Sequence, residues 1–157
     1  MLAAYQEATV VFAYAGFGSE LDTAALLRRI LGDGKTLLMS RVQKEIGRLQ
    51  LHYVSDLDEL APGIWGIQEP DPQRCPKAEP DALDLVVMPG AVFDTRCGRI
   101  GYGAGYYDKL LGGLAKRPYL VAPAFDLQIV GEVPMEPHDL RLDRVITERR
   151  EFVCQRK

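Results

Sequence analysis

The stretch Asp84-Leu-Val-Val-Met-Pro-Gly90, followed by Gly98-Arg-Ile-Gly-Tyr-Gly-Ala-Gly-Tyr-Tyr-Asp108, decides the fold class. Its first part is a short, continuous apolar run that ends in proline and glycine, which is typical of a fully buried strand. A glycine-rich connection then leads to a helix that we expect to begin at Gly105 or Tyr106 and to run to about Ala115. A buried strand, a loop and a helix in this order indicate one unit of an α/β fold.

Similar units lie on both sides of this stretch. A helix capped by Asp22 or Thr23 is expected to end at Gly32-Asp-Gly34, because glycine tolerates the left-handed conformation that follows a helix. No helix is expected before the first strand. The predicted strands are 9–14, 35–39, 49–54, 84–89, 119–124 and 143–147, with 128–133 ambiguous. We therefore expect residues 1–157 to form a single α/β domain with a mainly parallel sheet, and ligands to bind at the loops 16–20 and 90–108 after the strands.

Residues 61–81 form one long irregular segment. It contains five prolines, which exclude both a helix and a central strand. Loops of this length are usually functional or disordered. The apolar pair Trp65 and Ile67 favours a packed loop, so we predict no domain boundary here.

The composition excludes several classes of protein. The chain has 157 residues, of which 47% are hydrophobic and 26% charged, with a net charge of −3. This hydrophobic content excludes intrinsic disorder, and no apolar run reaches the about 18 residues that a membrane helix needs. The negative balance argues against nucleic acid as a partner. Because Cys75, Cys97 and Cys154 have no paired or metal-binding spacing, we expect free thiols in a reducing cytosol, and the first residues carry no targeting signal.

The glycine-rich stretch carries the chemistry. Gly101, Gly103 and Gly105 are spaced two apart directly before a helix, where backbone amides can approach a polyphosphate closely. Arg99 would add a full positive charge, and Asp108 would face a phosphate-bound Mg²⁺. The spacing matches neither a Walker A loop nor the dinucleotide-binding fingerprint. The alternative is a flexible turn in which Asp108 only complements the helix dipole.

Beyond these local patterns, residues 84–110 resemble the signature of the 5-formyltetrahydrofolate cyclo-ligase family. Four further segments resemble elements of the same family: Glu20-Leu-Asp-Thr23, Arg41-Val42, Trp65-Gly-Ile-Gln-Glu-Pro70 and His138-Asp-Leu-Arg-Leu-Asp143. The resemblance extends from about Thr9 to Ile146 and so covers nearly the whole chain.

The resemblance implies a fold and an activity. The fold is a three-layer α/β sandwich similar to the sugar-phosphate isomerase and coenzyme A transferase group. The activity is the ATP- and Mg²⁺-dependent cyclisation of 5-formyltetrahydrofolate to 5,10-methenyltetrahydrofolate, with release of ADP and phosphate through a phosphorylated formyl group. The expected partners are therefore a reduced folate and ATP, in a cytoplasmic monomer or weak homodimer with no nucleic acid and no membrane.

The family's functional residues carry over to numbered positions. The implied catalytic residues are Arg99, Tyr106 and Tyr107. The implied ATP-binding residues are Arg99, Ile100, Gly101, Tyr102, Gly103, Ala104, Gly105, Tyr106 and Tyr107. The implied folate-binding residues are Glu20, Trp65, Tyr102, Gly103, Ala104, Gly105 and Tyr106. The implied Mg²⁺ ligands are Asp108 and Asp139. In this scheme Glu20 accepts from the donor edge of the pterin, and Trp65 forms an aromatic wall near the formyl group.

Structural alternatives accompany these roles. Trp65 would hold its loop in the core, Glu20 would be a solvated charge, Asp139 a cap or turn residue and Tyr106 a core residue of its helix. Three other polar residues are expected to be without a catalytic role: Asp94, His52 and His138.

The chain departs from the family pattern in two places. Family members usually begin with a helix whose lysine and arginine bind the ATP phosphates, and this helix is missing here. The gene product is then longer than this chain, or Arg41 or Lys109 supplies the charge, or ligase activity is lost. Tyr102 and Ala104 also stand where some relatives carry arginine and lysine, which makes the phosphate site less positive. Two other functions stay open: a non-catalytic folate- or nucleotide-binding relative, and a sugar-phosphate isomerase, which the aromatic residues disfavour.

Overall fold

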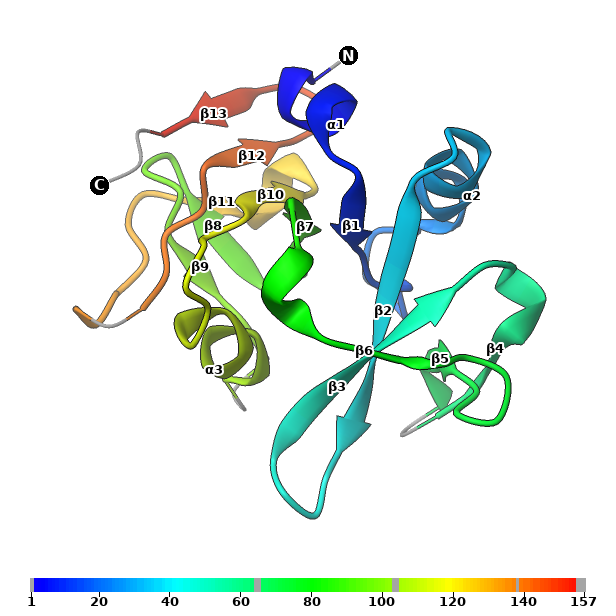
Figure 1. The fold of residues 1–157 in the computed structure, drawn as a ribbon. Coiled ribbons are helices and arrows are strands. Elements are labelled where there is room, and N and C mark those ends of the chain that lie inside the picture. The colour runs from blue at the N-terminus through cyan, green and yellow to red at the C-terminus, as the bar shows by residue number, and fades with distance from the viewer. Residues whose placement is uncertain (1, 64–65, 103–104, 138, 155–157) are drawn as a thin grey trace.

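The computed structural model of the chain describes residues 2–63, 66–102, 105–137 and 139–154. A large twisted sheet runs through the molecule, with helices beside it (Figure 1). The helices are α1 (Ala3–Glu7), α2 (Ala24–Gly32) and α3 (Tyr106–Gly112). Single 3₁₀ turns occur at Leu57–Glu59, Pro80–Ala82 and Asp126–Gln128. No helix in these ranges is long and apolar enough to cross a membrane.

The main sheet has eight strands, and its interior is parallel. In spatial order these are β13 (Glu151–Val153), β12 (Arg144–Ile146), β10 (Tyr119–Pro123), β7 (Leu85–Val87), β1 (Val10–Phe12), β2 (Thr36–Gln43), β3 (Arg48–Val54) and β6 (Lys77–Ala78). The five strands from β12 to β2 pair in parallel, and β13, β3 and β6 pair antiparallel at the two edges. The six predicted strands all lie in this sheet, whereas its strands β13 and β6 were not predicted.

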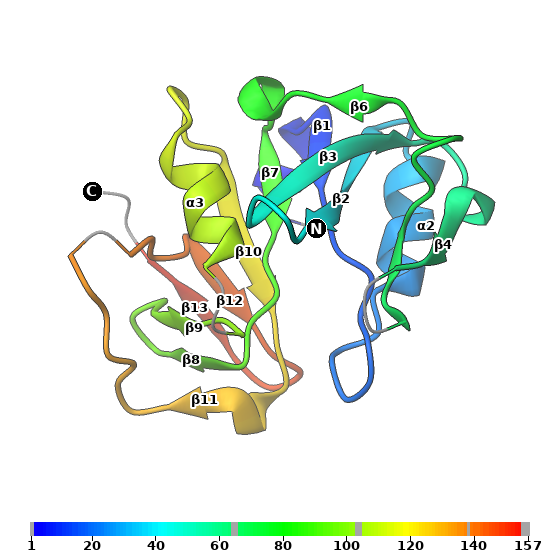
Figure 2. The same cartoon turned by 90° about the horizontal axis from the view of Figure 1, so that it is seen from below.

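Apolar side chains pack on both faces of the sheet. Phe12 points to the face that carries α3, where it shares a core with Leu111. Its neighbour Val11 points to the opposite face and packs with Leu27 and Ile30 of α2. Figure 2 shows α3 beside β7 and β10, and α2 beside β2. The expected three-layer α/β arrangement is therefore confirmed.

Two smaller sheets complete the fold. The strands β8 (Val92–Asp94), β9 (Arg99–Ile100) and β11 (Ile129–Val130) form one, so the ambiguous segment 128–133 does contain a short strand. The hairpin of β4 (Leu60–Pro62) and β5 (Gln68–Pro70) forms the other. This hairpin lies in the proline-rich segment, and Glu69 and Cys75 within that segment are buried. The segment is packed against the domain, as predicted.

The helices differ from the sequence prediction in two respects. A helix does precede β1, although α1 has only five residues and its apolar Leu2 and Tyr5 pack against the core. A single turn and a half is too short to show a helical period, which is why the sequence did not reveal it. The second difference concerns the C-terminal end of α3. This helix ends at Gly112 rather than near Ala115, with Gly113 at its C-cap position.

The prediction of three free thiols is wrong. Cys97 and Cys154 form a disulfide with a Cα–Cα distance of 6.3 Å, and only Cys75 is free. The two half-cystines are 57 residues apart and meet because β13 pairs with β12 at the edge of the sheet. Sequence spacing carries no signal for such a pair, since only the assembled sheet brings it together.

Candidate active site

The connection between strands changes direction at the centre of the main sheet. From β1 the chain moves to β2 on one side, whereas β7, β10 and β12 continue on the other side. Loops that leave β1 and β7 at their carboxyl ends therefore diverge and leave a crevice, which is where open α/β sheets bind ligands. The loops 13–23 and 88–105 start here, so the structure places both predicted functional loops at one edge.

Arg99 of β9 lies in this crevice with most of its side chain buried. Its Nε donates to the Pro89 carbonyl at 2.6 Å, and its Nη1 lies 3.9 Å from Oδ1 of Asp108. The guanidinium carbon is 5.7 Å from the centre of the Tyr107 ring. Burial lowers the pKa of Arg99, and the carboxylates of Asp108 and Asp139 oppose this change. The group remains a cation, because arginine is not deprotonated in proteins, and its contacts hold it in one orientation.

The glycines beside Arg99 make this arrangement sterically possible. A Cβ atom on Gly101 would lie 2.9 Å from Nη2 of Arg99. Gly105 directly precedes α3 and has a φ of 68°. Residues other than glycine seldom adopt this left-handed backbone conformation. Ile100 lies between Arg99 and Gly101 in the chain and is 40% exposed. Gly103 and Ala104, which the resemblance assigns to ATP and folate, lie outside the described residues.

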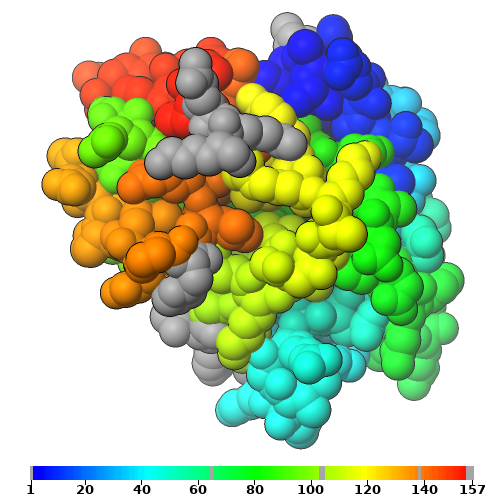
Figure 3. Space-filling view, turned by 60° about the vertical axis from the view of Figure 1, so that its left-hand side comes forward, coloured from blue at the N-terminus to red at the C-terminus, as the bar shows by residue number. Residues whose placement is uncertain are grey.

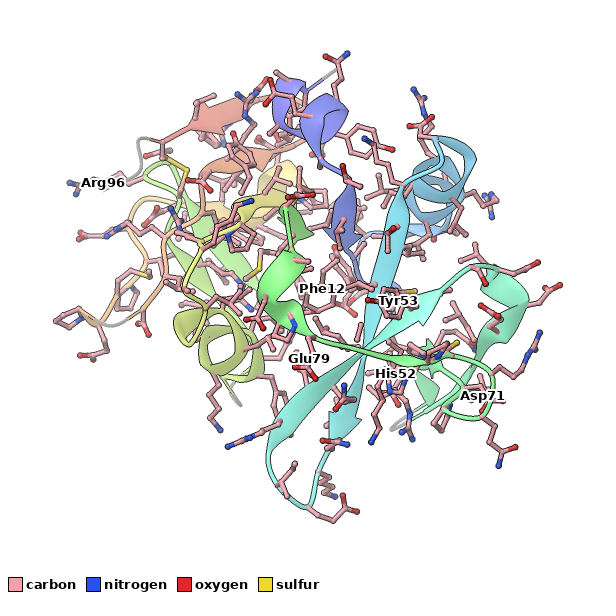
Figure 4. The ribbon with its side chains drawn as sticks, in the orientation of Figure 1. Phe12, His52, Tyr53, Asp71, Glu79 and Arg96 are labelled. Carbon is pink, nitrogen blue, oxygen red and sulfur yellow. A yellow bond between two sulfur atoms is a disulfide. The ribbon has the colours of Figure 1, made fainter. Side chains whose placement is uncertain are left out.

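Tyr107 connects the first turn of α3 to the sheet. Its ring stacks on Phe12 with centroids 5.3 Å apart and planes 4° apart; Phe12 is labelled near the centre of Figure 4. Burial raises the pKa of the Tyr107 hydroxyl, and a hydrogen bond with Ser40 of β2 partly offsets this effect. The Tyr107 ring thus packs against Arg99 on one side and is held in place by its stacking on Phe12.

Glu20 lies close to two tyrosines, Tyr14 of its own loop and Tyr102 of the loop after β9. Glu20 belongs to the loop after β1, and its Oε1 accepts from the Phe17 amide at 3.1 Å. Burial and the nearby Glu20 carboxylate together raise the pKa values of Tyr14 and Tyr102. Tyr102 is 65% exposed, and its hydroxyl lies 3.2 Å from the Gly90 carbonyl. Tyr14 and Ser40 are therefore candidate site residues that sequence reasoning missed. Tyr14 follows the end of β1 and Ser40 lies within β2, and neither has a motif around it.

Three of the remaining predicted residues are described: Asp108, Tyr106 and Asp139. Asp108 is in the first turn of α3 with its side chain 32% exposed, and Tyr106 beside it packs partly against the core. Asp139 accepts from the Glu136 amide at 2.8 Å, which is a contact within a turn. Its negative charge also opposes the lowering of the Arg99 pKa by burial. Trp65 and His138 lie outside the described residues.

Two residues expected to be structural have structural contacts. Asp94 accepts from the amides of Gly98 at 2.7 Å and Val133 at 2.8 Å, and it is 1% exposed. His52, labelled beside β3 in Figure 4, is buried and its Nδ1 donates to the Cys75 carbonyl at 2.8 Å.

Lys109 lies beside the crevice, at the hairpin of β2 and β3. Its ammonium is 5.9 Å from the centre of the Tyr106 ring, and a Cβ on Gly47 at the hairpin tip would lie 3.9 Å from it. Figure 3 shows the tip of this hairpin, in cyan, against the yellow-green surface of α3. Lys109 is one of the two basic residues, with Arg41, that we predicted as alternative sources of positive charge for the ATP phosphates.

The fold and the crevice together define an α/β protein with a small-molecule site at the switch point of its sheet, in which a fixed cation lies beside aromatic rings. The sequence matches the model of the 5-formyltetrahydrofolate cyclo-ligase family over residues 1–148. The chain belongs to this family.

Individual relatives agree with this assignment. The 5-formyltetrahydrofolate cyclo-ligase of Mycolicibacterium smegmatis is 30% identical over 151 residues, covering 93% of this chain and 77% of the relative. The mouse enzyme of the same name is 28% identical over 153 residues, covering 92% of this chain and 75% of the relative. The solution structure of the 5,10-methenyltetrahydrofolate synthetase of Aquifex aeolicus superposes with a TM-score of 0.82 at 26% identity, covering 99% of this chain and 77% of the other.

Proposed function

We propose that this chain catalyses the ATP-dependent cyclisation of 5-formyltetrahydrofolate to 5,10-methenyltetrahydrofolate. The observation that carries the proposal is the buried Arg99 guanidinium, which Pro89, Asp108 and Tyr107 hold in the same crevice that Glu20 enters from the other side. A fixed cation suits a transferring phosphoryl group, and a carboxylate among tyrosines suits the flat, donor-rich pterin.

The chemistry requires ATP because a formamide oxygen is a poor leaving group. Its attack on the γ-phosphorus forms an O–P bond and breaks the bond to the β,γ-bridging oxygen, which leaves with ADP. Nitrogen 10 then forms a bond to the formyl carbon and loses its proton, while the C–O bond breaks and its electron pair leaves with phosphate. Arg99 would neutralise the charge that spreads over the phosphoryl oxygens, and positioning supplies most of the remaining catalysis.

Glu20, Tyr102 and Trp65 are proposed to bind the folate. One oxygen of the Glu20 carboxylate accepts from the Phe17 amide. Besides burial, the negative charge of this carboxylate raises the pKa values of the nearby Tyr14 and Tyr102 hydroxyl groups. It would accept from the pterin amino and ring N–H groups. Tyr106 and Tyr107 remain candidates for catalytic roles, with Tyr107 suited to supporting Arg99.

Asp108 and Asp139 are proposed to hold Mg²⁺ together with the ATP phosphates. Within the described ranges no group of three or more His, Cys, Asp or Glu side chains could hold a metal. Mg²⁺ usually takes one or two carboxylates and completes its shell with phosphates and water, so Asp108 and Asp139 would hold it only together with bound ATP. When bound, Mg²⁺ would offset phosphate charge beside Arg99.

The test is direct turnover. Purified chain, Mg²⁺, ATP and 5-formyltetrahydrofolate are mixed, and the absorbance of the methenyl product is followed. Asp108→Ala is expected to reduce turnover by about a hundredfold or more at unchanged melting temperature. Asp81→Ala, which removes an exposed carboxylate at the amino end of β7, is the matched control and should leave turnover unchanged.

The outcomes separate the candidate functions. Folate binding without turnover, and without any effect of an ATP analogue, would replace the ligase by the non-catalytic binder. Full activity of the Asp108→Ala chain would remove its metal role. The cytoplasmic location, the monomer or weak homodimer and the absence of nucleic-acid and membrane partners stay predictions, and the Cys97–Cys154 disulfide is unusual for a reducing compartment.

A further inference from the structure

The Thr23 hydroxyl links two parts of the loop that follows β1. It donates to the Tyr14 carbonyl at 2.5 Å and accepts from the Gly16 amide at 3.2 Å. Thr23 is 1% exposed, so water does not compete for these bonds. The hydroxyl therefore closes residues 14–23 into a compact loop.

Thr23 is free to make these bonds because it does not cap the helix behind it. It occupies the N-cap position of α2, yet its side chain makes no capping hydrogen bond. The neighbouring Asp22 accepts from the Ala24 amide at 2.9 Å instead. The Asp22 side chain thus makes the hydrogen bond that a threonine at the N-cap usually makes. The Thr23 hydroxyl is directed back toward the loop instead.

The loop itself is tightly folded. A Cβ atom on Gly16 would lie 2.1 Å from the Leu21 carbonyl oxygen, so the chain crosses itself at close contact. Between these two positions the Glu20 amide donates to the Phe17 carbonyl at 3.1 Å, and Glu20 Oε1 accepts from the Phe17 amide at 3.1 Å. The direction of the Glu20 carboxylate is therefore determined by the path of the loop.

The other end of this link is rigid. The Thr23 carbonyl accepts from the Leu27 amide at 2.9 Å in the first turn of α2, and Leu27 and Ile30 of that helix are 2% and 0% exposed in the core. Tyr14 follows directly after β1 and is half-buried. The Thr23 hydroxyl thus connects the loop that carries Glu20 to α2 and to β1 at once.

We propose that Thr23 is a positioning residue that fixes the Glu20 carboxylate in the crevice and thereby sets the affinity for the pterin end of the substrate. This inference rests on the proposed function, in which Glu20 binds the pterin. Thr23 itself is buried, so its side chain would act through Glu20 rather than by contact with the substrate.

The test compares two substitutions of similar size. Thr23→Val retains the shape of the side chain and removes the hydroxyl, whereas Thr23→Ser retains the hydroxyl. Thr23→Val is expected to raise the KM and the dissociation constant for 5-formyltetrahydrofolate about tenfold. The KM for ATP should stay unchanged, and Thr23→Ser should behave like the native chain. A purely structural role would move both KM values together.

A double-mutant cycle shows whether Thr23 acts through Glu20. In a Glu20→Gln background, adding Thr23→Val should cause little further loss of folate affinity, because the group that it positions is already impaired. Multiplicative losses would overturn the proposal, as would native folate affinity in a folded Thr23→Val chain.

Two further measurements keep the result unambiguous. If Thr23→Val does not fold, Gly16→Ala displaces the same loop while retaining the Thr23 hydroxyl, whose partner is the Gly16 amide. It should raise the folate dissociation constant and leave the dissociation constant for an ATP analogue unchanged. Unchanged folate binding would then overturn the proposal. Folate binding by the native chain is measured first by equilibrium titration. If the native chain binds no 5-formyltetrahydrofolate, the proposed function fails and the inference fails with it; if the native chain binds and the variants bind equally well, only the inference fails.

Discussion

Single buried carboxylates hold hairpins and turns against the sheet. The carboxylate of Glu69 is 6% exposed, and its Oε2 accepts from the Val42 amide of β2 at 3.0 Å. Gly63 of the same hairpin passes so close that a Cβ there would lie 2.0 Å from Glu69 Oε1. One side chain thus holds the β4–β5 hairpin against the central sheet.

Replacing Glu69 tests this contact. Glu69→Ala is expected to lower the free energy of unfolding by about 1–3 kcal/mol, because the Val42 amide is left buried without an acceptor. Glu69→Gln, which retains an acceptor oxygen of the same reach, should lose clearly less. Urea unfolding of the three chains measures the difference, and equal losses for both variants would show that the charge rather than the hydrogen bond matters.

Asp94 makes stability depend on pH. Burial raises the pKa of this carboxyl, but the amides of Val133, Gly98 and Arg96 outweigh it, so the net pKa lies below its usual value. A depressed pKa in the folded state means that Asp94 stabilises the fold fully above its unfolded pKa of about 3.9 and loses that contribution as the pH falls through the folded value.

We therefore expect the free energy of unfolding to decline as the pH is lowered from about 5 toward 3, and Asp94→Asn to show a shallower decline. Chemical unfolding at a series of pH values checks this. Asp81→Asn, at an exposed carboxylate, is the control that should retain the native slope. A native slope in Asp94→Asn would assign the acid sensitivity to other carboxyls.

At the scale of elements, the disulfide ties the β8–β9 turn to the edge strand β13. The turn leads directly into Arg99, so the bond lies two residues from the cation of the crevice. Closing a loop of 57 residues removes chain entropy from the unfolded state, which loop-closure estimates put at about 4 kcal/mol.

Reduction should therefore destabilise the chain by about 2–4 kcal/mol. Urea unfolding with and without dithiothreitol measures this, and Cys154→Ser supplies the control, because it should unfold at the lower midpoint in both buffers. An identical midpoint of the native chain in both buffers would mean that the two thiols are not joined in solution.

Elements also show where sequence reasoning succeeds. The buried strand 85–87 and the helix after it are visible as an apolar run followed by glycines, and the spacing of Gly101 and Gly105 leads to Arg99 without any tertiary information. Tyr14, Ser40 and the orientation of the Thr23 hydroxyl are not visible, because their significance comes from which strand lies beside them. The disulfide and the edge strand β13 could not be predicted for the same reason, since β13 forms only by pairing with β12.

At the scale of the whole molecule, the position of the crevice follows from strand order. The strands β1 and β7 are neighbours in the sheet, yet the Val10 amide and the Asp84 carboxylate that join their beginnings are 74 residues apart in the chain. The hairpin of β2 and β3, by contrast, pairs residues of one continuous segment.

This difference gives the molecule an order of assembly. Contacts between near residues form quickly, whereas joining β1 to β7 must first overcome the entropy of closing a long loop. The crevice lies on that slow junction, with one wall from each side, so it exists only once the chain has completed its sheet. A ligand that bridges the two walls binds the finished molecule and not its partly folded precursors, and it therefore draws the population toward the native state.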